Sequence, residues 1–229
     1  SDTGSYYDAV NPVLGYSKDL AALITELYKK HKSKIVLGGH SIGGSLSIMA
    51  SKHLNDKVNG LVLADPVVIN YYYKYFTKFF GPLGYDSNTV KLYRQALKKR
   101  SKWKSFDEVL KSYTNRGIFK TWKEGFLYDY LIGGTKKDKN GVHLSCNPET
   151  EAASFINTEK ITTPNIVKNI NVPTLLLIAE SGSTTASISS FKKLKHLKQV
   201  ERIRGGSHFF PMEQPDKLIS LIKGFKSNS

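Results

Sequence analysis

The sequence predicts an α/β fold in which helices pack on a parallel β-sheet. Three short apolar runs, at residues 35–37, 61–64 and 172–179, have the length and composition of buried strands. A helical pattern lies between the first two runs, as in the right-handed crossover of a parallel sheet. A Gly-x-Ser-x-Gly sequence, from Gly39 to Gly43, begins two residues after the first run ends. The chain therefore passes through strand, sharp turn and helix in succession.

Composition and charge indicate a globular protein and argue against a membrane-spanning or nucleic-acid-binding one. The 229 residues suffice for one domain with an inserted subdomain, and 40% hydrophobic with 23% charged residues is ordinary for a globular chain. No apolar run approaches the ~18 residues of a membrane span. The net charge of +15 raises the possibility of a nucleic-acid partner, but the lysines are scattered and no RNA- or DNA-binding motif frames them. We therefore expect a solvated, lysine-rich surface and no nucleic-acid partner.

Cysteine and histidine usage bears on compartment and cofactors. The single cysteine, Cys146, excludes an internal disulfide framework and suits a reducing, intracellular compartment. Residues 226–229 do not match the Ser-Lys-Leu peroxisomal address, and we expect a cytoplasmic or peroxisomal location. No Cys/His cluster has metal-ligand spacing and no phosphate-binding glycine loop is present, so we expect neither a metal nor a cofactor.

Helices and strands alternate around the predicted sheet. Residues 1–16 have an irregular composition, and Ser17 has the residue type of an N-cap for a helix over 18–31. Apolar side chains recur there at helical spacing: Leu20, Leu23, Ile24, Leu27 and Tyr28. The other expected elements are a helix at 45–54, a strand at 172–179, a helix at 189–197, an edge strand at 199–204 and a last helix at 215–225.

The middle of the chain differs in composition from both ends. It holds nine of the thirteen tyrosines, seven of the eleven phenylalanines and both tryptophans. Helical patterns at 89–99 and 106–114, with a polar loop at 136–141, predict a mostly helical insertion. Aromatic residues such as those of Tyr71–Phe80 most often pack in a core, but they would line an apolar pocket if the insertion covers the serine turn. The predicted boundaries are a core of residues 1–66 and 166–229 and a helical cap of residues 67–165.

Ser41 is the candidate nucleophile. The serine of a Gly-x-Ser-x-Gly turn has a strained backbone, and we expect side chains at positions 39 and 43 to collide with the strand or the helix. The turn projects the hydroxyl above the sheet edge. It also aims the amide of Ile42 at the same space, at a helix N-terminus, which makes Ile42 the candidate oxyanion donor.

His208 is the candidate general base, because a serine hydroxyl needs a base to become a good nucleophile. It follows the last predicted strand at the turn Gly205-Gly206, where a loop can bring the imidazole over Ser41. His40 is adjacent to Ser41, but we expect its side chain to point elsewhere, into the pocket wall or the sheet.

These segments together resemble the α/β-hydrolase family, whose members carry them in the same order. The matching segments are residues 39–44, 61–66, 172–178 and 206–215. More narrowly, residues 65–69 and 142–152 are similar to a fungal subgroup that includes peroxisomal lipase-like and toxin-biosynthesis hydrolases. The resemblance implies an α/β-hydrolase fold, a capped active site and a Ser-acid-His order of catalytic residues.

The acidic member of the triad has two candidates. Family members most often carry an aspartate shortly after the strand equivalent to residues 173–179, but Gly182 occupies that position here. Some members take the acid from the end of the strand after the nucleophile strand, which is Asp65 in this chain. Glu180 lies close to the usual place but two positions early. We favour Asp65 and keep Glu180 as the alternative acid.

The resemblance covers only the C-terminal two-thirds of the family fold. A full member has several strands before the helix at 18–31, and one of their loops supplies a second oxyanion donor. We expect that a missing N-terminal segment or a second chain completes the sheet. Without it, the strand at 35–37 would leave unpaired backbone groups at an exposed edge.

The resemblance implies a serine esterase or lipase-like enzyme acting on a hydrophobic acyl ester. Ser41 would attack the acyl carbonyl, His208 would carry the proton, Asp65 would orient His208 and Ile42 would stabilise the oxyanion. Two alternatives stay open. The same triad can transfer the acyl group to an alcohol, and a catalytically impaired relative can use the pocket to bind a ligand.

Overall fold

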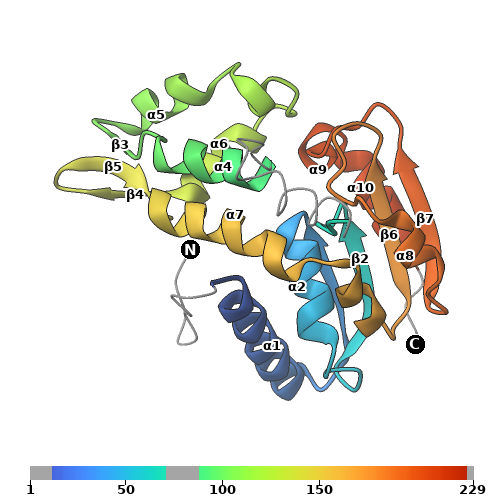
Figure 1. Cartoon of the computed structure of the whole chain (residues 1–229). Coiled ribbons are helices and arrows are strands. Elements are labelled where there is room, and N and C mark those ends of the chain that lie inside the picture. Colours follow the sequence, from blue (N-terminus) through green and yellow to red (C-terminus); the bar gives the residue numbers. More distant parts are fainter. Residues whose placement is uncertain (1–11, 71–87, 226–229) are drawn as a thin grey trace, which may run out of the picture.

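The computed structural model describes residues 12–70 and 88–225. A parallel sheet with helices on both faces forms one part, and a smaller helical part with an antiparallel sheet lies beyond the tips of its strands (Figure 1). The predicted α/β-hydrolase fold is therefore confirmed in its parallel sheet. The cap boundaries at residues 67 and 165 stay a prediction.

Within the described residues, the parallel sheet has four strands in the order β1-β2-β6-β7. Their bounds are β1 Ile35–His40, β2 Val58–Ala64, β6 Thr174–Ala179 and β7 Leu197–Ile203. All three pairings are parallel. Strand β6 is buried along its whole length, as a central parallel strand should be. Strand β1 lies at one edge of this sheet, and its residue Val36 is 43% exposed.

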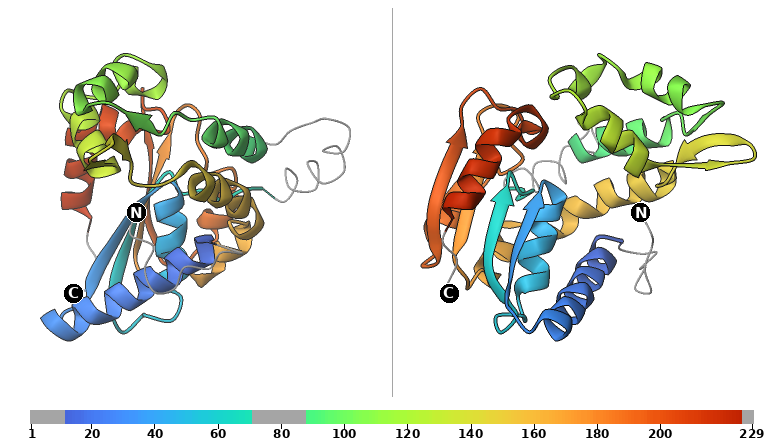
Figure 2. Two further views of the ribbon diagram at one scale, coloured as in Figure 1. Left: turned by 90° about the vertical axis from the view of Figure 1, so that its left-hand side faces the viewer. Right: turned by 180° about the vertical axis from the view of Figure 1, so that it is seen from behind.

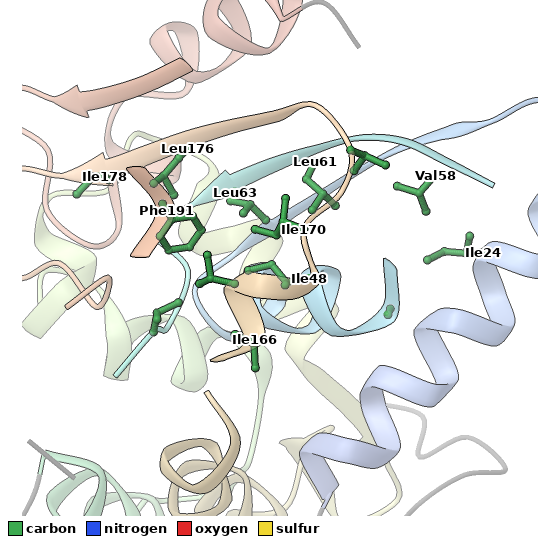
Figure 3. Close-up of a cluster of buried hydrophobic side chains, with 14 residues drawn as sticks. Ile24, Ile48, Val58, Leu61, Leu63, Ile166, Ile170, Leu176, Ile178 and Phe191 are labelled. Atoms are coloured by element: carbon green, nitrogen blue, oxygen red, sulfur yellow. The ribbon is translucent and has the colours of Figure 1, made fainter. Parts of the chain in front are cut away.

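Alternation along the strands divides the core into two layers. Leu61, Leu63, Leu176 and Ile178 point to one face, where Ile24, Ile48 and Phe191 pack on them (Figure 3). Val62, Leu175 and Leu177 point to the other face, where Phe210 and Leu218 cover them. The first layer is covered by α1 Pro12–His31, α2 Ile42–Ser51, η3 Pro164–Asn169 and α8 Ile188–Lys192, and the second by α9 Phe210–Glu213 and α10 Pro215–Gly224.

The first helix begins earlier than the sequence pattern predicts. Helix α1 starts at Pro12, which suits the first turn of a helix because proline lacks an amide hydrogen. The expected N-cap, Ser17, lies inside the helix, where its hydroxyl donates to the Leu14 carbonyl. That prediction was wrong by about a turn and a half, while the end of the helix at His31 is as predicted.

The smaller part contains helices and a three-stranded antiparallel sheet in the order β3-β5-β4. Its elements are α4 Asn88–Leu97, β3 Lys102–Trp103, α5 Phe106–Tyr113, η2 Gly117–Lys120, α6 Phe126–Gly134, β4 Thr135–Asp138 and β5 Gly141–Leu144. The expected polar loop at 136–141 is wrong, because these residues form most of a β-hairpin. Its core consists of Trp103, Val109, Leu131 and Val142.

Helix α7, Pro148–Ile161, joins the two parts. Asn147 caps its first turn by accepting a hydrogen bond from the Thr150 amide. The helix packs against both α4 and α1. In Figure 2 the elements from α4 to β5 lie together beyond the carboxyl ends of the parallel strands. The aromatic stretch Tyr71–Phe80 lies outside the described residues.

Candidate active site

Ser41 occupies a sharp turn between β1 and α2. Its backbone has φ 55° and ψ −125°, a strained conformation for a residue with a side chain. Its amide donates to the Ala64 carbonyl oxygen at 3.0 Å, which extends the β1–β2 ladder into the turn. The carbonyl oxygen of Ser41 in turn accepts a hydrogen bond from the Val67 amide. The turn is therefore held by the chain that follows β2.

The glycines around Ser41 have different roles from those expected. A Cβ at Gly39 would overlap the backbone of Gly43, so no larger residue fits there. A Cβ at Gly43 would meet nothing within 4 Å, and the expected collision at that position is wrong. The second tight position is Gly44, where a Cβ would lie 2.9 Å from the Cβ of Pro66.

His208 follows β7 on a turn that is hydrogen-bonded to the residues at the end of β6. Gly206 is required in this turn, because a Cβ there would lie 2.8 Å from the Ile203 side chain. The Gly206 carbonyl oxygen accepts hydrogen bonds from the amides of Glu180 and Ser181, at 3.0 and 3.2 Å. The loop that carries the imidazole is thus bound to the neighbouring strand.

The structure brings Ser41, His208 and Asp65 into one hydrogen-bonded line. The His208 Nε2 lies 2.9 Å from the Ser41 hydroxyl oxygen, and its Nδ1 lies 2.7 Å from an Asp65 carboxylate oxygen. The carboxylate can only accept, so Nδ1 carries the proton and donates it to Asp65. The lone pair of Nε2 then faces the serine hydroxyl.

Asp65 is fully buried at the end of β2, with 0% of its surface exposed. Its carboxylate also accepts hydrogen bonds from the Ala179 amide at 3.1 Å, the Ser183 hydroxyl at 2.5 Å and the Thr184 amide at 2.9 Å. Burial on its own would raise the pKa of Asp65, but the hydrogen bonds from His208, Ser183, Thr184 and Ala179 outweigh it and lower the pKa below its usual value. The carboxylate is therefore ionised at neutral pH.

Glu180, the alternative acid, has another contact. Its side chain is exposed, and one carboxylate oxygen accepts a hydrogen bond from the Gly205 amide at 2.7 Å. Gly205 has a φ of 69°, a left-handed conformation that favours glycine. Glu180 thus stabilises the turn before His208, while Asp65 contacts the imidazole.

His40 contacts the His208 loop, a relationship that the sequence interpretation missed. Its Nε2 lies 2.7 Å from the His208 backbone carbonyl oxygen, so Nε2 carries a proton and donates it. The two imidazole rings have centroids 4.7 Å apart. Burial lowers the pKa of His40, although its hydrogen bond to His208 opposes this, and the ring is neutral at physiological pH.

The amide of Ile42 lies at the N-terminus of α2 and donates to no acceptor within residues 12–70 and 88–225. A free amide beside the serine hydroxyl, at the positive end of a helix dipole, can stabilise an anion. Its role as oxyanion donor stays a prediction. In the same described ranges, no three His, Cys, Asp or Glu side chains converge as metal ligands would, and no helix is long and apolar enough to span a membrane.

Comparison with known proteins places the chain in a family. A sequence profile for the alpha/beta hydrolase family matches residues 2–221, and the chain belongs to this family. The resemblance inferred from the serine turn and the histidine loop is therefore confirmed. Comparison with curated protein sequences finds no match.

Several solved structures share the fold. E-2-(acetamidomethylene)succinate hydrolase aligns over 97% of this chain and 76% of its own, with a TM-score of 0.75 and 16% identity. The peroxisomal α/β-hydrolase Lpx1 from Saccharomyces cerevisiae aligns over 93% of this chain, with a TM-score of 0.72 and 19% identity. A thioesterase domain from the curacin biosynthetic pathway aligns over 97% and 74%, with a TM-score of 0.63 and 17% identity. The chain spans 58% of the length of the Saccharomyces hydrolase.

Proposed function

We propose that this protein is a serine hydrolase that cleaves a hydrophobic acyl ester, with Ser41, His208 and Asp65 as its catalytic triad. The observation that carries the proposal is the position of His208, which is hydrogen-bonded to both the Ser41 hydroxyl and the Asp65 carboxylate. Three side chains far apart in the sequence meet in the order that nucleophilic catalysis needs. Membership of the α/β-hydrolase family supports the same reaction class.

In the acylation step, the Ser41 oxygen bonds to the acyl carbon while its proton passes to Nε2 of His208. The carbonyl π electrons move to the oxygen, and the Ile42 amide stabilises the resulting oxyanion, at about 3 kcal/mol per donor. His208 then gives its proton to the leaving alcohol as the carbon–oxygen bond breaks. Asp65 stays ionised throughout and stabilises the transient imidazolium.

Deacylation repeats these steps with water. His208 takes a proton from water, the hydroxyl attacks the acyl–serine ester, and the proton returns to the Ser41 oxygen as that bond breaks. An alcohol in place of water would give a new ester by the same route. Adding ethanol and measuring ethyl ester against free acid therefore separates transfer from hydrolysis.

Aromatic side chains near the triad support an apolar substrate. The Phe209 ring lies 5.1 Å from the His208 ring and 6.0 Å from the Trp122 ring, centroid to centroid. Phe119 and Tyr130 in turn contact Trp122. A hydrophobic acyl chain suits these surroundings better than a charged one.

Replacing the nucleophile tests the proposal. We expect the wild-type chain to hydrolyse p-nitrophenyl butyrate and to be labelled by a fluorophosphonate, which reacts only with an activated serine. Ser41→Ala should abolish both reactions. Undiminished turnover in this variant would remove Ser41 from the mechanism, and an unlabelled but folded wild-type chain would favour a ligand-binding role.

A further inference from the structure

Residues 121–123 of the smaller part form hydrogen bonds with the loop that carries His208. The Thr121 hydroxyl donates to the Glu213 carboxylate at 2.7 Å, and the Lys123 amide donates to the Met212 carbonyl oxygen at 2.9 Å. Between them, the Trp122 ring packs against Phe209. Three consecutive residues of one part thus contact the turn and short helix that follow His208 in the other.

Glu213 connects these contacts to the residue before His208. One of its carboxylate oxygens accepts from the Thr121 hydroxyl and from the Ser207 hydroxyl at 2.6 Å. The other accepts from the Ser207 amide at 2.9 Å. The Ser207 hydroxyl oxygen also accepts a hydrogen bond from the Phe209 amide, so Glu213 and Ser207 together fix the backbone on both sides of His208.

Glu213 is ionised, which strengthens the hydrogen bonds that it accepts from Thr121 and Ser207. Desolvation would raise the pKa of Glu213, but the hydrogen bonds from Ser207 and Thr121 outweigh it and lower the pKa. An ionised carboxylate binds hydroxyl and amide donors more strongly than a neutral group does. Since Glu213 makes no contact with the imidazole in the described structure, it can act on the reaction only through His208.

We propose that Glu213 is a positioning residue that couples the segment at residues 121–123 to His208, so that a shift of this segment alters the alignment of the base. The inference rests on the proposed catalytic role of His208. The imidazole must keep hydrogen-bond geometry to Ser41 and Asp65 at once, and a displacement of about 1 Å can cost a large factor in rate. A shift of residues 121–123 would displace the Glu213 carboxylate, and this carboxylate would in turn displace Ser207.

Two substitutions at Thr121 separate coupling from simple stabilisation. Thr121→Val keeps the shape and loses the hydroxyl, whereas Thr121→Ser keeps the hydroxyl. We expect Thr121→Val to lower kcat for p-nitrophenyl butyrate by about threefold to tenfold with KM nearly unchanged, and Thr121→Ser to restore kcat. Glu213→Gln should lower kcat by at least as much, because it removes the charge and one acceptor oxygen.

Thr114 supplies the matched control. It is also exposed, and its hydroxyl donates only to the Leu110 carbonyl oxygen of the helix before it, at 2.8 Å. Thr114→Val therefore removes the same group without touching the His208 loop. Equal kcat values for the two valine variants would overturn the coupling, as would a loss at Thr121 that serine does not restore.

An NMR measurement on the resting protein tests the coupling without relying on hydrolysis, so it is independent of the test of the proposed function. The proton that His208 Nδ1 donates to Asp65 should give a low-field NMR resonance in the resting protein, with no substrate present. We expect this resonance to shift or broaden in Thr121→Val and Glu213→Gln and to stay in place in Thr114→Val. An unchanged resonance in all three variants would contradict the coupling. If the wild type does not react with a fluorophosphonate, the hydrolase assignment and the effect on kcat fail, and the resonance alone still tests whether Glu213 positions the imidazole.

Discussion

The Nε2 atom of His40 lies 2.7 Å from the backbone carbonyl oxygen of His208. The residue before the proposed nucleophile therefore holds the main chain of the proposed base. This bond joins the last residue of one edge strand, β1, to the loop that follows the other edge strand, β7. Glu213 holds the same stretch of main chain one residue earlier, by accepting a hydrogen bond from the amide of Ser207.

We expect His40→Phe to lower kcat by about tenfold, because it keeps a ring of similar size but leaves the His208 carbonyl oxygen without its donor. His40→Gln should retain most of the activity, since its side-chain amide can donate to the same oxygen. Steady-state kinetics on p-nitrophenyl butyrate measure both variants. Equal losses in the two would show that the ring, and not the hydrogen bond, matters.

The lowered pKa of His40 predicts a pH dependence of stability. The folded state binds a proton at His40 less readily than the unfolded state, so the contribution is complete above the ordinary pKa of 6.5 and is lost as pH falls through the lowered folded value. Between about pH 7.5 and 5.5, the free energy of unfolding should fall further in the wild type than in His40→Gln. Urea denaturation at several pH values tests this, and parallel curves would contradict it.

The two candidate acids can be separated by amide substitutions. Asp65→Asn should lower kcat by a factor on the order of 10³ to 10⁴, because the amide no longer fixes the tautomer or balances the imidazolium charge. Glu180→Gln should change kcat by less than about threefold, because its side-chain oxygen still accepts from the Gly205 amide. A larger loss at Glu180 than at Asp65 would reverse the assignment.

Ser183→Ala removes a hydroxyl that donates to Asp65 at 2.5 Å. Since this hydrogen bond helps to lower the pKa of Asp65, the pKa should rise toward its ordinary value in the variant. A depressed carboxyl pKa contributes stability above the ordinary value of 3.8, and this is lost as pH falls through the folded pKa.

The wild type should therefore lose more stability than Ser183→Ala when acidified from about pH 5 to pH 3, as followed by thermal unfolding. Ser190→Ala is a matched control, because its hydroxyl bonds to that of Ser187. If the control flattened the acid dependence as much as Ser183→Ala, the effect would not come from Asp65.

The glycines of the serine turn should respond differently to alanine. Gly39→Ala should destabilise the protein by more than about 3 kcal/mol, because the new methyl group overlaps the backbone of Gly43. Gly43→Ala should be neutral or stabilising by up to about 1 kcal/mol, since the position is open and alanine favours the helix. Urea unfolding midpoints measure both, and comparable losses would contradict the difference in space.

Much of the fold could be predicted because its strands are apolar and short. The runs at 35–37, 61–64 and 172–179 correspond to β1, β2 and β6. The hairpin of β4 and β5 could not be predicted, because Thr135–Asp138 is polar and carries no alternating pattern. Its pairing depends on β5, whose Val142 packs in the core of the smaller part.

The meeting of the candidate site's side chains could be predicted where a local motif marks them, while their catalytic roles stay a proposal. Ser41 and His208 each follow a strand at a glycine turn, and the structure places both side chains, with Asp65, within hydrogen-bonding distance. The supporting contacts of His40 and Glu213 were missed, because each depends on a loop more than a hundred residues away or on a bond between the two parts. Two of the donors to Asp65, Ser183 and Thr184, belong to a run of small polar residues after β6, which does not by itself indicate a partner.

Two of the three proposed catalytic residues have left-handed backbones, with φ 55° at Ser41 and 44° at Asp65. Glycine adopts this region without the steric penalty that a Cβ brings. The residues proposed for catalysis are therefore not the ones that would make these two turns most stable. A Ser41→Gly protein should be inert yet melt at a higher temperature than Ser41→Ala. Thermal stability and catalytic activity therefore favour different residues at position 41. A screen of variants for thermal stability alone would select against the nucleophile.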